Sequence, residues 1–245
     1  MDLIRPDWPA PAWVQAWSTT RSGGVSEGPF DSLNLGDHVG DDAERVGRNR
    51  ARVREHLGLP AEPLWLRQVH GCEVAEAGAV PSGCAADAAV ARSPGRVCAV
   101  LTADCLPLLL CDRVGQVVAA VHAGWRGLAA GVVEQAVGAL AVDPWQVLAW
   151  LGPAIGPDAF EVGPEVRDEF LAADSGAGQA FRPAMGGRWL ADLDTLARRR
   201  LERVGVRSVY GGGHCTFSDP SRFFSYRRDG VTGRMASLIW LVRTS

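Results

Sequence analysis

Two histidines and a cysteine stand at the ends of apolar segments and carry side chains that bind transition metals. His70 ends the run Leu-Arg-Gln-Val-His, Cys105 lies within Ala-Asp-Cys-Leu-Pro, and His122 lies within Val-His-Ala-Gly-Trp. Two imidazoles and a thiolate suit zinc, and three protein ligands leave a fourth position open for water or substrate. The spacing is not that of a zinc finger or an HExxH helix, so the residue types carry this prediction. Plain packing of these side chains is the alternative.

Asp104 adds a carboxylate to the same region. It interrupts the apolar run from 97 to 110, and a carboxylate is costly to bury in such a run unless it is paired. We predict that Asp104 orients a metal-bound imidazole or moves protons during a reaction. The alternative interpretation is a turn or cap residue between two strands.

All 25 basic residues are arginines, and the chain has no lysine. This excludes a Schiff base to pyridoxal phosphate and a P-loop, because both need a lysine. An anion must therefore be bound by arginine, by backbone amides or by a metal. Arg50 is a candidate because it falls on the otherwise apolar stripe of a predicted helix, although an internal ion pair would also explain its position. Arg21, beside a Gly-rich loop, and Arg126 are further candidates.

Many short strands and a few helices must position these residues. Apolar runs bounded by turn residues predict strands over 14–20, 64–70, 97–103, 106–111, 117–123, 147–151, 206–210 and 235–242. Helices are predicted from a cap at Asp41 or Asp42 to Gly58, over 127–140, from Pro164 onward and over 190–204. Strands outnumber helices and do not alternate with them, so we predict an α+β fold with mixed sheets flanked by helices, in one domain over 1–245. The Gly-rich segment 21–40 is predicted to be a functional or disordered loop.

Composition narrows the class of protein. Hydrophobic residues make up 47%, charged residues make up 22%, and the formal net charge is -3. We therefore expect a globular protein that has neither nucleic acid nor a membrane as a partner. No apolar run approaches the ~20 residues that cross a bilayer, and residues 1–20 lack a signal-peptide pattern. The six cysteines form no CxxC pair, so we expect free thiols in a reducing cytoplasm. The oligomeric state stays open, with a monomer among the options.

Seven motifs, in order along the chain, resemble the YfiH-like family, also called the laccase-domain or polyphenol oxidase family and described as purine nucleoside phosphorylases. The motifs are Thr-Arg-Ser-Gly-Gly-Val-Ser at 20–26, Ser-Leu-Asn-Leu-Gly at 32–36, Gln-Val-His-Gly at 68–71, Thr-Ala-Asp-Cys-Leu-Pro at 102–107, His-Ala-Gly-Trp-Arg-Gly at 122–127, Leu-Gly-Pro-Ala-Ile-Gly-Pro at 151–157 and Phe-Phe-Ser-Tyr-Arg-Arg-Asp at 223–229. The resemblance implies that His70, Cys105 and His122 bind one zinc ion. It also implies a fold similar to that of toxin deamidases with a Cys–His site. Asn34 and Gln68 lie in two of these motifs, and we expect them to contact substrate or phosphate.

The resemblance also implies an activity. It implies phosphorolysis of adenosine, inosine, guanosine and methylthioadenosine to free base and sugar 1-phosphate, with a secondary adenosine deaminase activity, in the cytoplasm. The expected partners are a purine nucleoside and phosphate, and the expected cofactor is zinc. Cys105 and Asp104 are the expected catalytic residues, with Asp104 moving protons. Arg50, Arg21 and Arg126, in that order, are the candidates for binding phosphate.

Three other functions stay open. A copper-dependent polyphenol oxidase is the family's older description. A laccase cluster needs several coppers and more than five histidines, but one copper can still occupy a site of two histidines and a cysteine. A metal-free cysteine hydrolase would use Cys105 as nucleophile and His122 or His70 as base. A closed structural zinc in a binding protein would need a fourth protein ligand.

Overall fold

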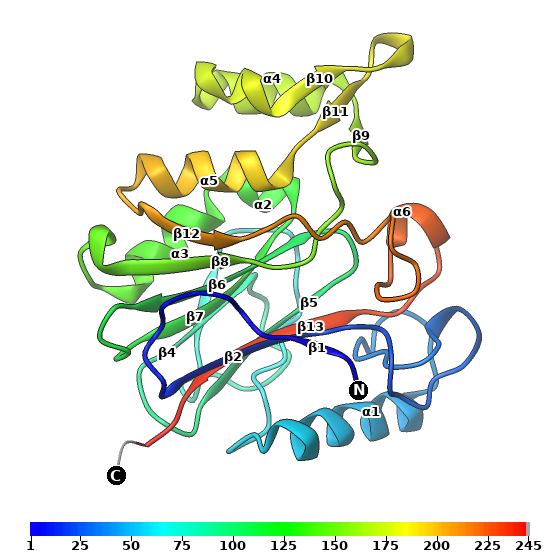
Figure 1. The fold of residues 1–245 in the computed structure, drawn as a ribbon, viewed down its shortest axis with the longest axis vertical. Helices are drawn as coiled ribbons and strands as arrows, with labels where there is room; N and C mark the ends of the chain where they lie inside the picture. The colour runs from blue at the N-terminus through cyan, green and yellow to red at the C-terminus, as the bar shows by residue number, and fades with distance from the viewer. Residues whose placement is uncertain (244–245) are drawn as a thin grey trace.

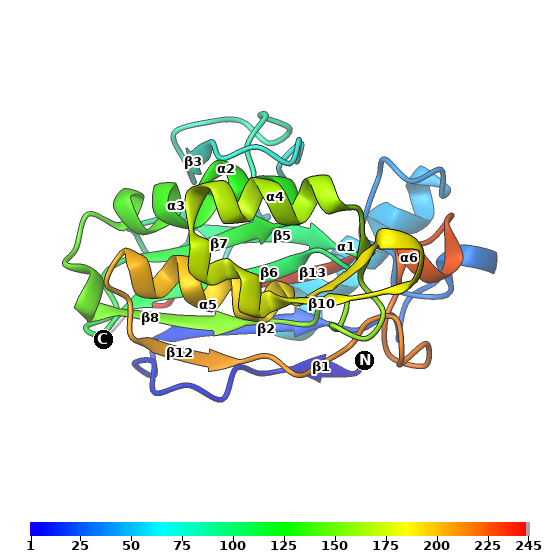
Figure 2. The ribbon, with the colours of Figure 1, turned by 90° about the horizontal axis from the view of Figure 1, so that it is seen from above.

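Two β-sheets are stacked face to face, and helices cover both outer sides (Figures 1 and 2). The structure is a computed structural model and describes residues 1–243. The antiparallel four-stranded sheet has the order β1 (Leu3–Ile4), β2 (Val14–Thr19), β13 (Met235–Leu241) and β5 (Val97–Thr102). The six-stranded sheet has the order β12 (Ser208–Gly211), β8 (Val147–Leu151), β6 (Leu106–Asp112), β7 (Val118–Ala123), β4 (Ala88–Ala91) and β3 (Val74–Glu76). Its two edge pairs are parallel and its inner pairs antiparallel, so this sheet is mixed.

The helices are divided between the two outer faces. Helix α1 (Ala43–Leu57) covers the four-stranded sheet, whereas α2 (Trp125–Ala130), α3 (Val132–Leu140) and α5 (Leu193–Arg203) cover the six-stranded sheet (Figure 1). The remaining elements are α4 (Pro164–Ala173), α6 (Tyr226–Asp229), the small sheet of β10 (Phe181–Pro183), β11 (Trp189–Ala191) and β9 (Glu161–Val162), and 3-10 turns at Gly28–Phe30, Pro144–Gln146, Ser175–Ala180 and Met185–Gly187. Between residues 1 and 243, no helix is both long and apolar enough to cross a membrane.

The central strands are buried on both faces, which explains why they read as continuous apolar runs. Successive side chains of a strand point to opposite faces. Along β5, Ala99 and Leu101 pack with α1, whereas Val100 packs between the two sheets. Along β6, Leu108 packs with the outer helices and Leu109 packs between the sheets. The strands that flank the predicted site are therefore held by two apolar layers at once.

The predicted α+β fold with mixed sheets flanked by helices is confirmed. Helix α1 has the predicted ends, because the Asp42 carboxylate accepts a hydrogen bond from Arg45 N and Gly58 adopts the left-handed conformation. Pro164 opens α4, as predicted. Apart from 64–70, the predicted strands begin and end within two residues of the observed ones.

Three predicted elements are wrong in their extent. Segment 64–70 forms only isolated bridges, and His70 has a φ of 60°, which a strand does not allow. The single helix predicted over 127–140 is two helices, because Gly131, with a φ of 97°, ends α2 and begins α3. Helix α5 begins at Leu193 after its cap Asp192, because residue 190 belongs to β11.

Segment 21–40 is ordered by a buried asparagine of α1. Oδ1 of Asn49 accepts a hydrogen bond from Val25 N at 2.8 Å, and Nδ2 donates to Ser26 Oγ and Asn34 O, each at 2.9 Å. These bonds satisfy the buried amide and fasten the loop to the helix. The loop therefore has a packed structure, although its sequence reads as flexible.

Candidate metal centre

The pairing of β6 with β7 brings Cys105 and His122 together. Strand β6 begins directly after Cys105, and its register pairs Pro107 with His122. His122 is 4% exposed, Cys105 is half-buried and His70 is exposed. His70 arrives from the irregular segment before β3, and its ring centroid lies 4.8 Å from that of His122, at an angle of 74°. His122 thus stands on the sheet, Cys105 stands in the turn directly before β6, and His70 stands on a loop.

The three side chains fit a single metal ion. One potential ligand atom from each of His70, Cys105 and His122 lies within 4.8 Å of the others. The distance from Nε2 of His70 to Sγ of Cys105 is 3.9 Å. Tetrahedral zinc with ordinary Zn–N and Zn–S bonds separates a nitrogen and a sulfur ligand by roughly 3.5 Å. A small inward movement of these side chains would therefore complete the site, with a fourth position left for substrate or water.

Asp87 supports this trio from behind, and it is fully buried. Its Oδ1 accepts hydrogen bonds from Nδ1 of His122 at 2.8 Å and from His70 N at 2.9 Å. Its Oδ2 accepts from Val69 N at 3.1 Å and from Gly71 N at 2.8 Å. Because an ionised carboxylate only accepts, Nδ1 of His122 carries a proton, so Nε2 is the nitrogen that would bind a metal after losing its own proton. One carboxylate thus orients one imidazole and holds the backbone that carries the other.

The charges of these groups are coupled. Burial raises the pKa of Asp87, but hydrogen bonds from His122 and from the backbone of Gly71 and Val69 outweigh it and lower that pKa. Burial also opposes ionisation of Cys105, but the charges and hydrogen bonds of His122 and His70 lower its thiol pKa. The thiolate is the form of cysteine that binds metals. The site therefore favours a charged sulfur ligand near neutral pH.

Asp104 has a different environment from the one predicted. Its Oδ1 accepts a hydrogen bond from Thr216 Oγ1, and its Oδ2 accepts one from Arg227 N, each at 2.6 Å. Its φ of 93° places it in the turn between β5 and β6. The carboxylate that holds an imidazole is therefore Asp87, and Asp104 matches the alternative of a turn residue. A role for Asp104 in proton transfer stays a prediction. Asp87 was not among the residues selected from the sequence. The pattern that could have indicated it is a carboxylate directly before the apolar strand β4.

The amides of Asn34 and Gln68 are used by the protein itself. Both amide atoms of Gln68 pair with the backbone of Leu101 at 2.8 Å, which ties the His70 segment to β5. Asn34 is buried, and its Oδ1 accepts from Gly36 N and Arg234 N, each at 2.9 Å. The structure gives both residues positioning roles, and their contact with substrate or phosphate stays a prediction.

Two of the three predicted phosphate ligands are also engaged. Arg50 donates from Nε to Leu35 O at 3.0 Å, and its Nη2 lies 3.2 Å from Asp37, so the alternative of an internal ion pair describes it. Arg21 donates to two backbone carbonyls. Arg126 is exposed, stacks on the adjacent tryptophan ring and forms no ion pair among residues 1–243. Of the three, Arg126 is the one whose guanidinium makes no hydrogen bond to the protein among residues 1–243.

Gly124 provides the space in which the trio meets. A Cβ at this position would lie 2.9 Å from Sγ of Cys105 and 3.2 Å from Cδ2 of His70, although the backbone angles suit alanine. We expect Gly124→Ala to displace these side chains and weaken metal affinity by about 10- to 100-fold, the range for disturbed support of a metal ligand. A competition titration with a chelator measures this. Gly138→Ala in α3, where a Cβ meets nothing within 4 Å, is the control, and equal affinities in the two variants would contradict the prediction.

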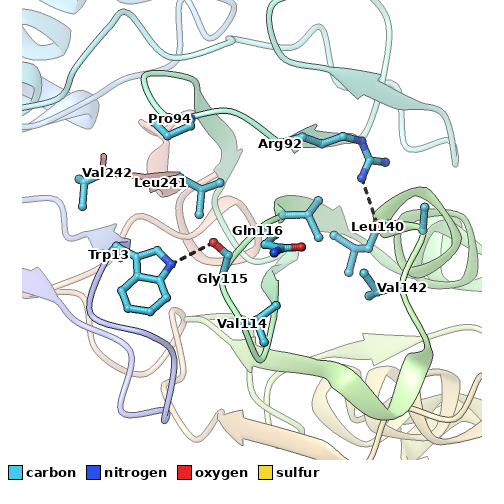
Figure 3. Close-up of a pocket in the computed structure, with 12 residues that line it drawn as sticks. Trp13, Arg92, Pro94, Val114, Gly115, Gln116, Leu140, Val142, Leu241 and Val242 are labelled. Atoms are coloured by element: carbon cyan, nitrogen blue, oxygen red, sulfur yellow. Dashed lines mark hydrogen bonds between the residues drawn. The ribbon is translucent and has the colours of Figure 1, made fainter. Parts of the chain in front are cut away.

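A wide pocket lies away from this chemistry. It has a volume of about 740 Å³ and is lined by the β6–β7 turn around Gly115, by Trp13, by Arg92 and by the end of α3 (Figure 3). Cys105 and His122 stand at the opposite ends of these two strands, roughly 20 Å away at the usual rise per residue. The pocket lining holds no histidine, cysteine or carboxylate, so it offers no catalytic group.

The chain is similar to known proteins along nearly its whole length. Residues 15–242 match the family described as multi-copper polyphenol oxidoreductase laccase. Purine nucleoside phosphorylase YfiH of Escherichia coli strain K12 is 55% identical over 241 residues, which cover 98% of this chain and 99% of that protein. A purine nucleoside phosphorylase of Pseudomonas aeruginosa is 59% identical over 240 residues, which cover 97% of this chain and 98% of that protein.

Solved structures agree with this similarity. The crystal structure of a Neisseria meningitidis protein has a TM-score of 0.95 and 52% identity, and covers 99% of this chain and 100% of that chain. The crystal structure of Bacillus licheniformis hypothetical protein YfiH has a TM-score of 0.87 and 32% identity, and covers 96% of this chain and 97% of that chain. The four-layer architecture is therefore shared by these proteins.

Proposed function

This chain belongs to the YfiH-like, laccase-domain family, and from that premise we propose that it is a zinc-dependent purine nucleoside phosphorylase. Its substrates would be adenosine, inosine, guanosine and methylthioadenosine together with phosphate, and it would also deaminate adenosine. The observation that supports the proposal is the trio of His70, Cys105 and His122 on one buried carboxylate, in a chain closely similar to proteins named purine nucleoside phosphorylases. A reducing cytoplasm suits its six cysteines, which are all free.

The donor set favours zinc. His70, Cys105 and His122 would hold it, since two imidazoles and a thiolate are borderline-soft ligands. When bound, the metal supplies Lewis acidity next to the substrate. Asp87 keeps the His122 proton on Nδ1 and fixes the ring. Because His70 is exposed, a substrate reaches the trio from the side of its loop.

Phosphorolysis sets further requirements on the protein. An oxygen of phosphate forms a bond to C1′ of the sugar, while the bond from C1′ to the purine nitrogen breaks. The electron pair leaves with the base, which takes up a proton, and the sugar passes through an oxocarbenium-like state, as in glycoside cleavage. The protein must therefore bind phosphate and deliver a proton. Asp104 is our proposal for the proton carrier, because it adjoins Cys105.

Metal removal tests this proposal. We expect the protein as isolated to contain about one zinc per chain and to release adenine from adenosine only when phosphate is present. Removal of zinc by a chelator should abolish release, zinc addition should restore it, and circular dichroism should show a folded protein throughout. Release that persists without metal would instead support the hydrolase that uses Cys105. Unfolding on metal removal would support a structural zinc.

The family description favours phenol oxidation as a second candidate. Between residues 1 and 243, however, the trio is the one group of three or more metal-capable side chains, which does not provide ligands for a cluster of several coppers. A single copper on the trio is the version compatible with the structure. Oxidation of a phenol at equal rates by zinc-only and copper-loaded protein would contradict this version. Oxidation by the copper-loaded form alone would support it.

A further inference from the structure

The beginning of β13 brings an arginine to the edge of the candidate metal centre. Met235, the first residue of β13, pairs with Thr102, the last residue of β5. The chain leaves β5 at that point toward Asp104 and Cys105, so Arg234 stands beside them. Its backbone N donates to Oδ1 of the buried Asn34 at 2.9 Å. The position of this residue next to the trio is therefore fixed by the sheet and by a buried amide.

The Arg234 guanidinium is anchored along one side only. Its Nη1 donates to Thr232 O at 2.9 Å and to Gly233 O at 3.0 Å, and its central carbon lies 5.9 Å from the ring centroid of Tyr226. Within residues 1–243, Nε and Nη2 make no hydrogen bond. Nε and Nη2 form the edge of a guanidinium that binds two oxygens of an oxyanion at once. Arg234 therefore presents an oriented, unused edge.

The charge of Arg234 also has no partner in the described chain. No carboxylate of residues 1–243 lies within 4.0 Å of it, whereas the partly buried Arg199 and Arg200 contact Asp174 and Glu134 at 2.7 and 2.9 Å. The carboxylate of the neighbouring Asp104 already accepts two other hydrogen bonds. A partly buried cation without an ion pair is costly, so an anionic ligand would stabilise it.

The surrounding charges are consistent with such a ligand. Burial lowers the pKa of Arg234, and the negative charges of Cys105 and Asp104 partly oppose that effect. A divalent metal on the trio would outweigh the thiolate charge, and Arg234 offsets the carboxylate of Asp104. An anion beside Arg234 would therefore be attracted by the guanidinium and by the metal.

We propose that Arg234 binds inorganic phosphate beside the trio and positions it for attack on the sugar. The inference rests on the phosphorolysis proposed above and names the residue that it requires. Arg50 and Arg21 are held elsewhere by Asp37 and by backbone carbonyls. Arg126 is exposed and stacks on Trp125. Arg234 differs from these three because it is partly buried beside Asp104 and because, among residues 1–243, its Nε and Nη2 form a guanidinium edge without a hydrogen bond.

Steady-state kinetics of Arg234→Gln test the proposal. We expect the KM for phosphate to rise at least about tenfold, since charge-assisted hydrogen bonds are lost, while the KM for adenosine and the zinc content change little. Arg234→Lys should recover part of the affinity, because it restores the charge without the two-pronged edge. Arg198→Gln is the matched control, since Arg198 is also partly buried and also donates to two backbone carbonyls. An unchanged KM for phosphate in Arg234→Gln, or an equal rise in Arg198→Gln, would overturn the proposal.

Direct binding separates this inference from the proposed function. Titration of the zinc-loaded protein with inorganic phosphate, followed by calorimetry or ³¹P NMR, requires no turnover. Saturable binding by the wild type that is lost in Arg234→Gln supports the inference even when no nucleoside is cleaved. Absence of saturable binding in the wild type, or equal binding by the variant, overturns it even when the protein is a phosphorylase.

Discussion

Cys105→Ala is expected to lose both zinc and phosphorolysis while it keeps its fold. The variant leaves two imidazoles, one of which stands on an exposed loop, and it removes the only negatively charged ligand. We therefore expect a loss of metal affinity larger than the roughly 10- to 100-fold that follows from disturbing a ligand's supporting group. Metal analysis after gel filtration, adenine release from adenosine, and thermal denaturation provide the three measurements.

Cys84→Ala is the matched control for this variant, because Cys84 is also free and half-buried but lies outside the trio. It should retain zinc and activity. Adenine release by metal-free Cys105→Ala at the wild-type rate would remove both the metal and the thiol from the reaction. Loss of zinc from both variants would show that the effect is not specific to the trio.

Asp87→Asn is expected to combine a large loss of metal affinity with a loss of stability. The carboxylate accepts four hydrogen bonds from His122 and from the backbone of 69–71. The NH2 group of an asparagine cannot accept a hydrogen bond, so some of these N–H groups would lose their acceptor. We expect metal affinity to fall by about 10- to 100-fold. Each buried donor left unpaired should cost about 1–3 kcal/mol in the free energy of unfolding. Chelator competition and urea denaturation of the metal-free protein measure the two effects separately.

Asp112→Asn separates the two effects of that substitution. Asp112 is equally buried, and its Oδ1 accepts from Gln116 N at 2.6 Å and Val117 N at 2.9 Å, at the end of β6 remote from the trio. It should lose stability and keep its metal affinity. Wild-type zinc affinity in Asp87→Asn would contradict the role of Asp87 in orienting His122.

The dependence of the unfolding free energy on pH in acidic solution gives a further test of the role of Asp87. Its pKa is lowered in the folded protein, so its contribution is complete above the ordinary carboxyl pKa of about 3.9 and is lost as the pH falls through the lowered value. The difference in unfolding free energy between the metal-free wild type and Asp87→Asn should therefore shrink in strongly acidic solution. A difference that stays constant into that range would show that the carboxylate charge does not contribute.

The residues of the trio could be predicted from the sequence, whereas their support could not. Cys105 and His122 stand at the ends of apolar strands, and residues at the ends of paired strands lie close together at one edge of the sheet. Asp87 reads as an ordinary residue before a strand, because its four donors come from segments that are distant in the sequence. The β4–β7 pairing brings His122 to it, and the bridge between Arg67 and Ala85 together with the β3–β4 pairing brings the amides of 69–71. Arg234 was identified because it forms no ion pair among residues 1–243 and because its Nε and Nη2 make no hydrogen bond there. A sequence does not show which contacts a side chain lacks.

Local chemistry explains which elements were predicted well. The capping aspartate and terminal glycine of α1 act within one turn, so their effect can be read directly from neighbouring residues. Segment 64–70 has the apolar residues of a strand, but the carboxylate of Asp87 takes the amides of 69–71 that a strand would offer to its neighbour. The competing acceptor lies far along the chain, beyond the reach of any local pattern.

The place of β13 in the four-stranded sheet has a consequence for how the chain folds. This strand lies between β2 and β5, and Ala236 N donates to Thr19 Oγ1 across a separation of 217 residues. Until β13 pairs with them, β2 and β5 each have one edge whose backbone groups lack a neighbouring strand. Such high contact order predicts slow folding and an intermediate prone to intermolecular strand pairing. Because Arg234 enters with β13, the anion-binding side of the site is completed only in this late step.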